Sequence, residues 1–512
     1  MKDTHFWDAA EDDESREDTV KLQKFSAGEA GLFLPIDAFD TTFSLQNMRA
    51  KDVEPVEATS TRKLSQVAVA EAPERTQAPI LPPPPAPKTP MSRGLAIFLM
   101  LLLLAVVVEA TNNGFGQFIG SQGWAFVLGS SQSTSENNLL QNAAKQFRQQ
   151  TPTTGATAQA TQPITPQEYI NAIIQHMTLQ QKLGQLMIVQ FTGPTYGLDI
   201  SSMISQYDVG AVLLFTANDN IVSKPQLKGL IQQMQHNSAI PLIVAIDQEG
   251  GTVDRLISLD GPRPSATSIG DTGDTNKARA EGILDAQDLS YYGFNLNLAP
   301  VVDVNNVYNP QMYLRTFGTN PTIVTKMASA YLQGLQQSGK VLGTLKHFPG
   351  LGDVSADPHN AVPHLTRSLS QLEAIDWAPY RALIQQGNVH AIMVTHELVS
   401  AIDPTIPSSL SYKLVTGILR NQFGFQGVIV TDSLTMEGIA AYYNEAQAAA
   451  LAIEAGDDLI MGAASPGDVA NMINGIEQAV NSGSISVARI DESVSRILML
   501  KYEMGLIHLP TP

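Results

Sequence analysis

From residue 165 to near residue 510, short apolar runs rich in β-branched residues alternate with segments that have the 3.6-residue period of a helix. Each apolar run ends near a Gly, Pro or acidic residue and is short enough for a buried strand. The candidate strands are 185–191, 209–215, 241–247, 294–304, 341–347, 389–396, 427–432 and 457–461, and the candidate helices are 224–237, 276–292, 324–338, 369–386, 411–423, 444–455 and 488–504. Eight strands alternating with helices predict a (β/α)8 barrel, with a doubly wound open sheet as the alternative.

A different pattern occupies residues 94–108, where fifteen apolar residues or glycine follow one another with no polar face. The run is short for a bilayer span, which typically needs about 20 apolar residues, but thinning of the bilayer accommodates such a difference. Lys88 and Arg93 precede it, and no Lys or Arg follows before Lys145. We therefore expect a transmembrane anchor at 93–111 with its N-terminal side in the cytoplasm. A cleaved signal is the alternative, although it would begin unusually far along the chain.

The remaining parts lack sustained periodicity of either kind. Residues 1–92 are acidic near the start and end in a proline run, which is typical of a disordered cytoplasmic tail. Residues 112–164 are rich in Ser, Thr, Gln and Gly and predict a flexible stalk with one short helix near 138–149. We expect residues 165–512 to form one barrel domain, displayed outside the cell.

Composition excludes several classes of function. The formal net charge of -18 leaves no basic stripe to follow a nucleic-acid backbone, so no nucleic-acid partner is expected. The chain has no cysteine, which rules out disulfides, thiolate metal sites and a cysteine nucleophile.

Ionisable side chains gather at the ends of the predicted strands. These residues are Asp247, Asp303, Lys346 with His347, His396 and Asp432. Any one of them could instead cap a helix or join an ion network. Together they favour an active site, because catalytic residues of barrel enzymes lie at the C-terminal ends of the strands.

The densest cluster of such residues runs from Lys346 to Pro363. It reads Lys346-His347-Phe348-Pro349-Gly350-Leu351-Gly352-Asp353, followed by Asp357-Pro358-His359 and Pro363. This stretch resembles the signature of glycoside hydrolase family 3 in its β-N-acetylhexosaminidase branch, Lys-His-(Phe/Ile)-Pro-Gly-x-Gly followed by Asp-x-His and Pro. The resemblance covers roughly residues 165–510 and itself implies a barrel fold.

The resemblance also implies catalytic roles. Asp432, in Thr431-Asp432-Ser433-Leu434-Thr435-Met436, is similar to the family's nucleophile, which forms a covalent glycosyl-enzyme. His359 matches the general acid and base, and Asp357 would orient its imidazole. Histidine suits this role because its ordinary pKa, about 6.5, lies close to physiological pH. A competing interpretation makes Asp432 the N-cap of the following helix.

A sugar-binding set follows from the same likeness. Asp247, in Asp247-Gln248-Glu249-Gly250-Gly251, resembles a family motif that accepts hydrogen bonds from sugar hydroxyls. Lys346, His347 and Arg315 would donate to the same sugar. We expect Gly250 and Gly251 to form a tight turn and Asp303 and His396 to shape the site, while Glu249 and Arg255 could simply pair with each other. His347, Asp357 and His359 could in principle coordinate zinc, but neither a metal nor another cofactor is expected.

The implied activity is that of a retaining exo-β-N-acetylglucosaminidase that acts on peptidoglycan fragments or chitin-type oligosaccharides. The chain stops soon after the last predicted helix, so we expect a single barrel domain without the second domain of many β-glucosidases, and a monomer. The alternatives are a β-glucosidase or glycoside phosphorylase of the same family, and an inactive carbohydrate-binding module.

Overall fold

The computed structural model describes residues 133–148, 164–354 and 362–510. Eight strands close a barrel in the order β1-β10-β9-β7-β5-β4-β3-β2, and all neighbouring strands are parallel. They are β1 Met187–Val189, β2 Ala211–Leu214, β3 Ile243–Ile246, β4 Leu296–Asn297, β5 Leu342–Phe348, β7 Ala391–Val394, β9 Val428–Ser433 and β10 Leu459–Met461. Each of the eight predicted strands is present, and the predicted barrel is confirmed.

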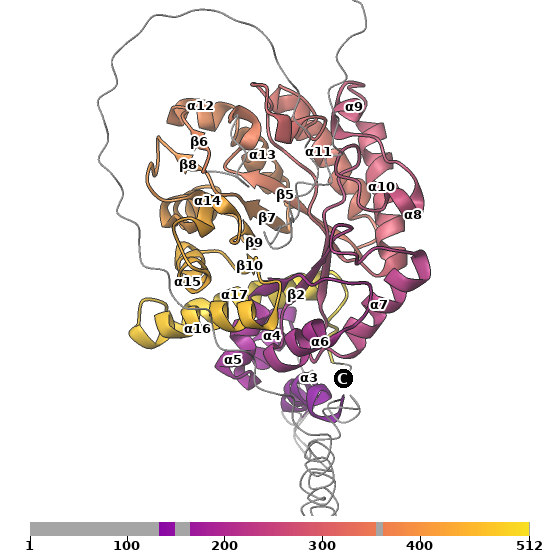
Figure 1. The fold of residues 1–512 in the computed structure, drawn as a ribbon, viewed down its shortest axis with the longest axis vertical. Coiled ribbons are helices and arrows are strands. Elements are labelled where there is room, and N and C mark those ends of the chain that lie inside the picture. The colour runs from indigo at the N-terminus through magenta and orange to yellow at the C-terminus, as the bar shows by residue number, and fades with distance from the viewer. Residues whose placement is uncertain (1–132, 149–163, 355–361, 511–512) are drawn as a thin grey trace, which may run out of the picture. The chain divides into compact units, whose positions relative to one another are not determined.

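The strands form continuous apolar runs because both of their faces are covered. Every residue of β2, β3 and β10 is buried. Figure 1 shows the strands at the centre and the helices around them. A parallel sheet that is covered on both sides needs apolar side chains on both sides, which explains why the strands do not alternate between apolar and polar residues.

Many of the surrounding helices begin at a polar capping residue. Thr165, Ser223 and Asn444 each form a capping box at the start of a helix. The longer helices are α3 Ser133–Arg148, α4 Pro166–His176, α6 Leu198–Tyr207, α7 Lys224–His236, α10 Thr275–Tyr292, α11 Pro321–Leu335, α13 Ala378–Gln386, α15 Glu445–Ala455, α16 Pro466–Ser482, α17 Val487–Glu503 and the π-helix η5 Lys413–Gln422. Shorter ones are α5 Leu179–Gln185, α8 Ile257–Asp260, α9 Ala266–Gly270, η2 Pro310–Met312, η3 Leu351–Asp353, α12 Leu369–Ala374, η4 Ser408–Leu410 and α14 Glu437–Ala440.

Two sequence predictions about elements were wrong. The expected helix 369–386 is two helices, α12 and α13, because Pro379 lies in the first turn of α13 and cannot continue a helix from the preceding turn. The expected strand 294–304 is reduced to β4, since Pro300 has no N–H to donate to a neighbouring strand. Helix α16 and a two-stranded sheet of β6 His364–Leu365 and β8 Leu398–Val399 were not anticipated.

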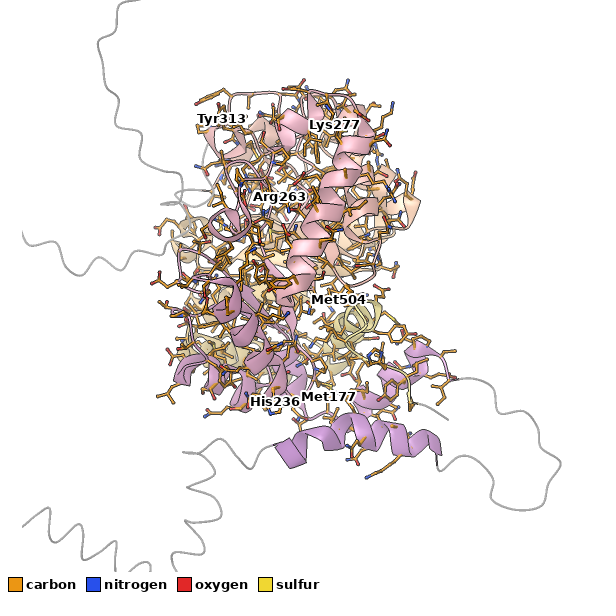
Figure 2. All side chains as sticks on the ribbon, turned by 90° about the vertical axis from the view of Figure 1, so that its right-hand side faces the viewer. Met177, His236, Arg263, Lys277, Tyr313 and Met504 are labelled. Atoms are coloured by element: carbon orange, nitrogen blue, oxygen red, sulfur yellow. The ribbon has the colours of Figure 1, made fainter. Side chains whose placement is uncertain are left out.

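The two ends of the barrel can be told apart by labelled side chains. In Figure 2, Tyr313 and Lys277 lie at one end, and His236 and Met177 lie at the other. Lys277 is in the first turn of α10, and His236 is the last residue of α7. In a β/α repeat each helix starts where its strand ends, so the end marked by Tyr313 is the one that barrel enzymes use for catalysis.

The predicted anchor lies outside the described residues. Within the described ranges, every helix is too short or too polar to span a lipid bilayer. The segment 93–111, the tail 1–92 and most of the stalk 112–164 belong to the other residues, so these three boundaries stay predictions.

Candidate active site

Four of the residues predicted to bind substrate meet at the C-terminal end of the barrel. Asp247 directly follows β3, Lys346 and His347 are in β5, and Arg315 lies on the connection from β4 to α11. The closed barrel gathers its strand ends at one end, where the residue after β3, the residues of β5 and the loop that carries Arg315 come together. The structure thus brings together residues that are up to 100 positions apart in the sequence.

Lys346 is the centre of this cluster. Its ammonium group forms an ion pair with Asp247 and another with Glu249, whose oxygen lies 2.6 Å away. Only 2% of its side chain is exposed. A buried ammonium group needs such partners, because the loss of hydration is not otherwise compensated.

Glu249 is a site residue that sequence reasoning missed. Its carboxylate accepts two hydrogen bonds of 2.7 and 2.8 Å from the guanidinium of Arg315, and Arg255 lies 3.9 Å from the Asp247 carboxylate. A signal was present: residues 247 and 249 are two apart at the end of a strand, and such residues point to the same face.

The pKa values of the two carboxyl groups in this cluster are shifted in opposite directions. Burial by itself would raise the pKa of Glu249, but Arg315 and Lys346 outweigh it and hold that pKa well below the usual range. Burial raises the pKa of Asp247, the nearby Glu249 carboxylate adds to this rise, and Lys346 opposes it. The two cations therefore favour the charged form of Glu249.

The glycines next to Glu249 form the expected tight turn. Gly250 and Gly251 have φ angles of +79° and +61°, in the left-handed region that favours glycine. A Cβ at Gly250 would lie 2.3 Å from the carbonyl oxygen of Pro264. The turn thus carries the chain away from the site without a side chain at its tightest point.

His347 is held from behind by Asp303. Its Nδ1 lies 2.8 Å from Asp303 Oδ2, and the backbone N–H of Leu351 donates to Asp303 Oδ1 at 2.8 Å. Nε2 of His347 faces a guanidinium nitrogen of Arg315 at 3.4 Å. Asp303 is buried and orients its neighbours, which agrees with its interpretation as a site-shaping residue.

Asp432 stands at the end of β9 on the same end of the barrel. Its Oδ1 accepts a hydrogen bond of 2.8 Å from the N–H of Ser433, and its Oδ2 lies 3.5 Å from the hydroxyl of Thr395. The following helix α14 has Met436 as its N-cap, without a side-chain cap. The competing interpretation of Asp432 as that cap is therefore wrong.

His396 supports the strand end that carries Asp432. One ring nitrogen lies 2.7 Å from the hydroxyl of Ser409, and the other lies 2.9 Å from the backbone oxygen of Ser433. The imidazole is fully buried. It holds the backbone next to Asp432, as expected of a residue that shapes the site.

Asp357 and His359 lie outside the described residues, within 355–361. The chain on both sides of them is described. The N–H of Leu351 is bound by Asp303, and the backbone oxygen of Pro363 accepts a hydrogen bond of 2.9 Å from Leu398. No group of three or more possible metal ligands occurs among the residues on either side of this gap.

These features define a class of protein: a (β/α)8-barrel enzyme whose site is lined with paired charges and suits a neutral ligand rich in hydroxyl groups. The sequence also matches a known protein family. Residues 178–500 match the glycosyl hydrolase family 3 N terminal domain. The chain belongs to glycosyl hydrolase family 3.

Relatives and solved structures agree with this assignment. Beta-hexosaminidase A from Pseudoalteromonas piscicida is 30% identical over 64% of this chain, which spans 62% of that protein's length. Beta-hexosaminidase LpqI from Mycobacterium tuberculosis is 32% identical over 63% of this chain and 82% of its own. A family 3 β-N-acetylglucosaminidase from Paenibacillus sp. has a TM-score of 0.61 and 35% identity, covering 64% of this chain and 63% of the other.

Proposed function

We propose that the chain is a retaining exo-β-N-acetylglucosaminidase, which releases terminal N-acetylglucosamine from peptidoglycan fragments or chitin-type oligosaccharides. The observation that carries this proposal is the cluster of Asp247, Lys346, Glu249 and Arg315 at the same barrel end as Asp432. Relatives named as β-hexosaminidases and a solved β-N-acetylglucosaminidase support the choice of sugar.

The cluster would hold the terminal sugar by its hydroxyl groups. Lys346 and Arg315 donate hydrogen bonds, and Asp247 accepts them. Because Glu249 already binds both cations, their side chains are fixed before a sugar arrives. Such preorganisation lowers the entropy lost on binding.

Asp432 would then attack the anomeric carbon and form a covalent glycosyl-enzyme, while His359 donates a proton to the departing oxygen. A water molecule, deprotonated by the same histidine, would release the sugar and restore the Asp432 carboxylate. The hydrogen bond from Ser433 keeps one carboxylate oxygen in place and leaves the strand end rigid.

A β-glucosidase or a glycoside phosphorylase remains the alternative within the family. A β-glucoside phosphorylase with a TM-score of 0.60 is 26% identical to this chain. A neutral imidazole would repel a phosphate nucleophile less than a second carboxylate would. Phosphorolysis would produce a sugar 1-phosphate in place of the free sugar.

The test is a substrate comparison with the purified full chain in detergent. Aryl β-N-acetylglucosaminide and aryl β-glucoside are supplied side by side, with and without phosphate, and the sugar products are identified. The proposal predicts preferential release of free N-acetylglucosamine in both buffers. Cleavage of the glucoside alone would overturn the substrate, a sugar 1-phosphate would overturn the reaction, and turnover of neither substrate by folded protein would favour the binding module.

A further inference from the structure

A buried asparagine lies directly behind the sugar-binding cluster. Asn297 is the last residue of β4 and is fully buried. Its Oδ1 accepts a hydrogen bond of 3.0 Å from the N–H of Gln248, and its Nδ2 donates one of 2.8 Å to the carbonyl oxygen of Gln248. Gln248 stands in the sequence between Asp247 and Glu249, the two carboxylates that pair with Lys346. One side chain therefore binds both backbone groups of the residue between these two carboxylates.

These two hydrogen bonds hold the peptide bonds on both sides of Gln248. The N–H of Gln248 belongs to its peptide bond with Asp247, and its carbonyl oxygen belongs to its peptide bond with Glu249. Each peptide unit is planar, so a hydrogen bond to its N–H or C=O group restrains the whole plane. The two planes determine the directions in which the side chains of residues 247 and 249 leave the backbone. Asn297 thus controls how both carboxylates enter the site.

Asn297 takes over where the pairing between β3 and β4 ends. The strands pair from Ala245 with Leu296 to Ile246 with Asn297. Gln248 lies two residues beyond the end of β3, and there the side chain of Asn297 supplies the hydrogen bonds. A side-chain amide carries both a carbonyl acceptor and N–H donors, as a peptide group does, so it can replace a strand at this point. The turn after β3 therefore starts from a fixed residue.

The amide of Asn297 is itself oriented by the outer helices. Its Nδ2 also donates to the hydroxyl oxygen of Tyr331, in α11, at 3.2 Å. The Tyr331 hydroxyl in turn donates to Asp285, in α10, at 2.6 Å. Because the Tyr331 hydrogen is directed at Asp285, the hydroxyl oxygen is available as an acceptor for Asn297. Hydrogen bonds therefore connect two packed helices (Figure 1) to the strand end that carries the carboxylates.

The side chain of Gln248 is held on its other side. Its Oε1 accepts hydrogen bonds from the backbone N–H groups of Arg255 and Leu256 at 2.8 and 3.2 Å. Its Nε2 donates to Asp254 at 2.8 Å. Gln248 is buried, so any rotation would leave several polar groups without partners and away from water. Its backbone is fixed by Asn297 and its side chain by the loop that follows the glycine turn.

We propose that Asn297 is a positioning residue for sugar binding: through the backbone of Gln248 it fixes the directions of Asp247 and Glu249, and so places the groups that meet the hydroxyls of the sugar. The proposal rests on the proposed function, in which Asp247 accepts hydrogen bonds from the terminal sugar. In this role Asn297 acts through its neighbours and does not touch the sugar.

The test measures sugar binding without turnover. A thio-linked β-N-acetylglucosaminide resists hydrolysis, and isothermal titration calorimetry gives its dissociation constant for the purified full chain in detergent. Asn297→Ala should weaken binding about 10-fold or more, which is the usual weight of one hydrogen bond to a charged group. The expected loss arises because a misdirected Asp247 no longer meets the sugar in the right geometry.

The chain offers a matched control near the other end of β3. Asn295 is also buried, and it holds the peptide bonds on both sides of Ile243 in the same way. Its Oδ1 accepts from the N–H of Val244 at 2.9 Å, and its Nδ2 donates to the carbonyl oxygen of Leu242 at 3.2 Å. Asn295→Ala should lower the Tm as Asn297→Ala does, but leave the dissociation constant of the sugar nearly unchanged.

A double variant separates positioning from a general loss of stability. Part of the effect of Asn297 passes through Asp247, so Asn297→Ala should weaken binding less in an Asp247→Asn protein than in the wild type. A purely structural role would give the same loss in both. If Asn297→Ala does not fold, Asn297→Ser replaces it, with the same expected pattern.

Three results would overturn the inference: wild-type affinity in the Asn297 variant, equal losses of affinity in the Asn295 and Asn297 variants, or the same loss with and without Asp247. A thio-linked β-glucoside is titrated in parallel. If the wild type binds only the glucoside, the sugar of the proposed function is wrong, and the same comparison made with the glucoside decides the inference. If the wild type binds neither sugar, both proposals fail.

Discussion

At the scale of single residues, the site depends on charges that cannot be removed one at a time. Lys346 is shared by two carboxylates, and Glu249 is shared by two cations. Sequence reasoning identified Asp247, Arg315, Lys346 and His347 because each lies in a recognisable motif. It missed Glu249 because the cations that pair with this buried carboxylate, Arg315 and Lys346, come from other parts of the chain, and the spacing from Asp247 indicates only that the two carboxylates share a face.

Replacing Lys346 tests this arrangement. Lys346→Met leaves Asp247 with Arg255, 3.9 Å away, and should lower the free energy of unfolding by about 3 kcal/mol, as expected for a broken buried ion pair. Adding Asp247→Asn should restore part of this loss. Urea denaturation measures both, with the exposed Lys277→Met as the control. A loss below about 1 kcal/mol, or a double variant with fully additive losses, would contradict the account.

At the scale of elements, the sequence pattern did not locate every helix end, and packing inside the protein determines the rest. The break between α12 and α13 places Asp376 and Trp377 inside the protein, although the pattern predicted one continuous helix. Pro379 gave the only local signal, and a proline in a first turn equally suits the start of a helix. Helices α10 and α11 pack side by side on the barrel (Figure 1), and between them the Tyr331 hydroxyl donates to Asp285 at 2.6 Å.

The buried pair of Tyr331 and Asp285 should make the stability of the fold depend on pH. Burial raises the pKa of Asp285 to about 8, so the folded state holds a proton that the unfolded state loses above about pH 4. The stabilisation that protonated Asp285 gives to the folded state is fully present below about pH 4 and is lost as the pH rises toward about 8. Asp285→Asn should therefore flatten the fall in Tm between pH 5 and 7, whereas the exposed Asp271→Asn should not. Equal slopes for wild type and Asp285→Asn would refute this assignment.

At the scale of the whole molecule, the barrel was predictable because eight buried parallel strands leave a strong apolar signal in the sequence. The end of the barrel that carries the site was predictable for the same reason, since strand ends locate it. The anchor at 93–111 is a different kind of prediction, because it rests on the local composition of residues outside the described ranges.

We propose that this anchor holds the barrel outside the cell, and a fractionation experiment tests it. The full chain should remain with the membranes after an alkaline carbonate wash. Leu101→Arg with Leu103→Arg should release it, because two charges in the apolar run each oppose insertion by roughly 3 kcal/mol. Ser133→Arg with Ser135→Arg, in the stalk, is the matched control. A wild-type chain that washes off the membranes would contradict the proposal.

The most direct test of the central claim is to trap the sugar on Asp432. An activated 5-fluoro-N-acetylglucosaminide should accumulate the glycosyl-enzyme, because fluorine slows both steps and the good leaving group favours the first. Mass spectrometry of the digested protein should find one sugar on the peptide that contains Asp432, and none in the Asp432→Asn variant. A sugar on another residue, or undiminished turnover by Asp432→Asn, would show that Asp432 is not the nucleophile.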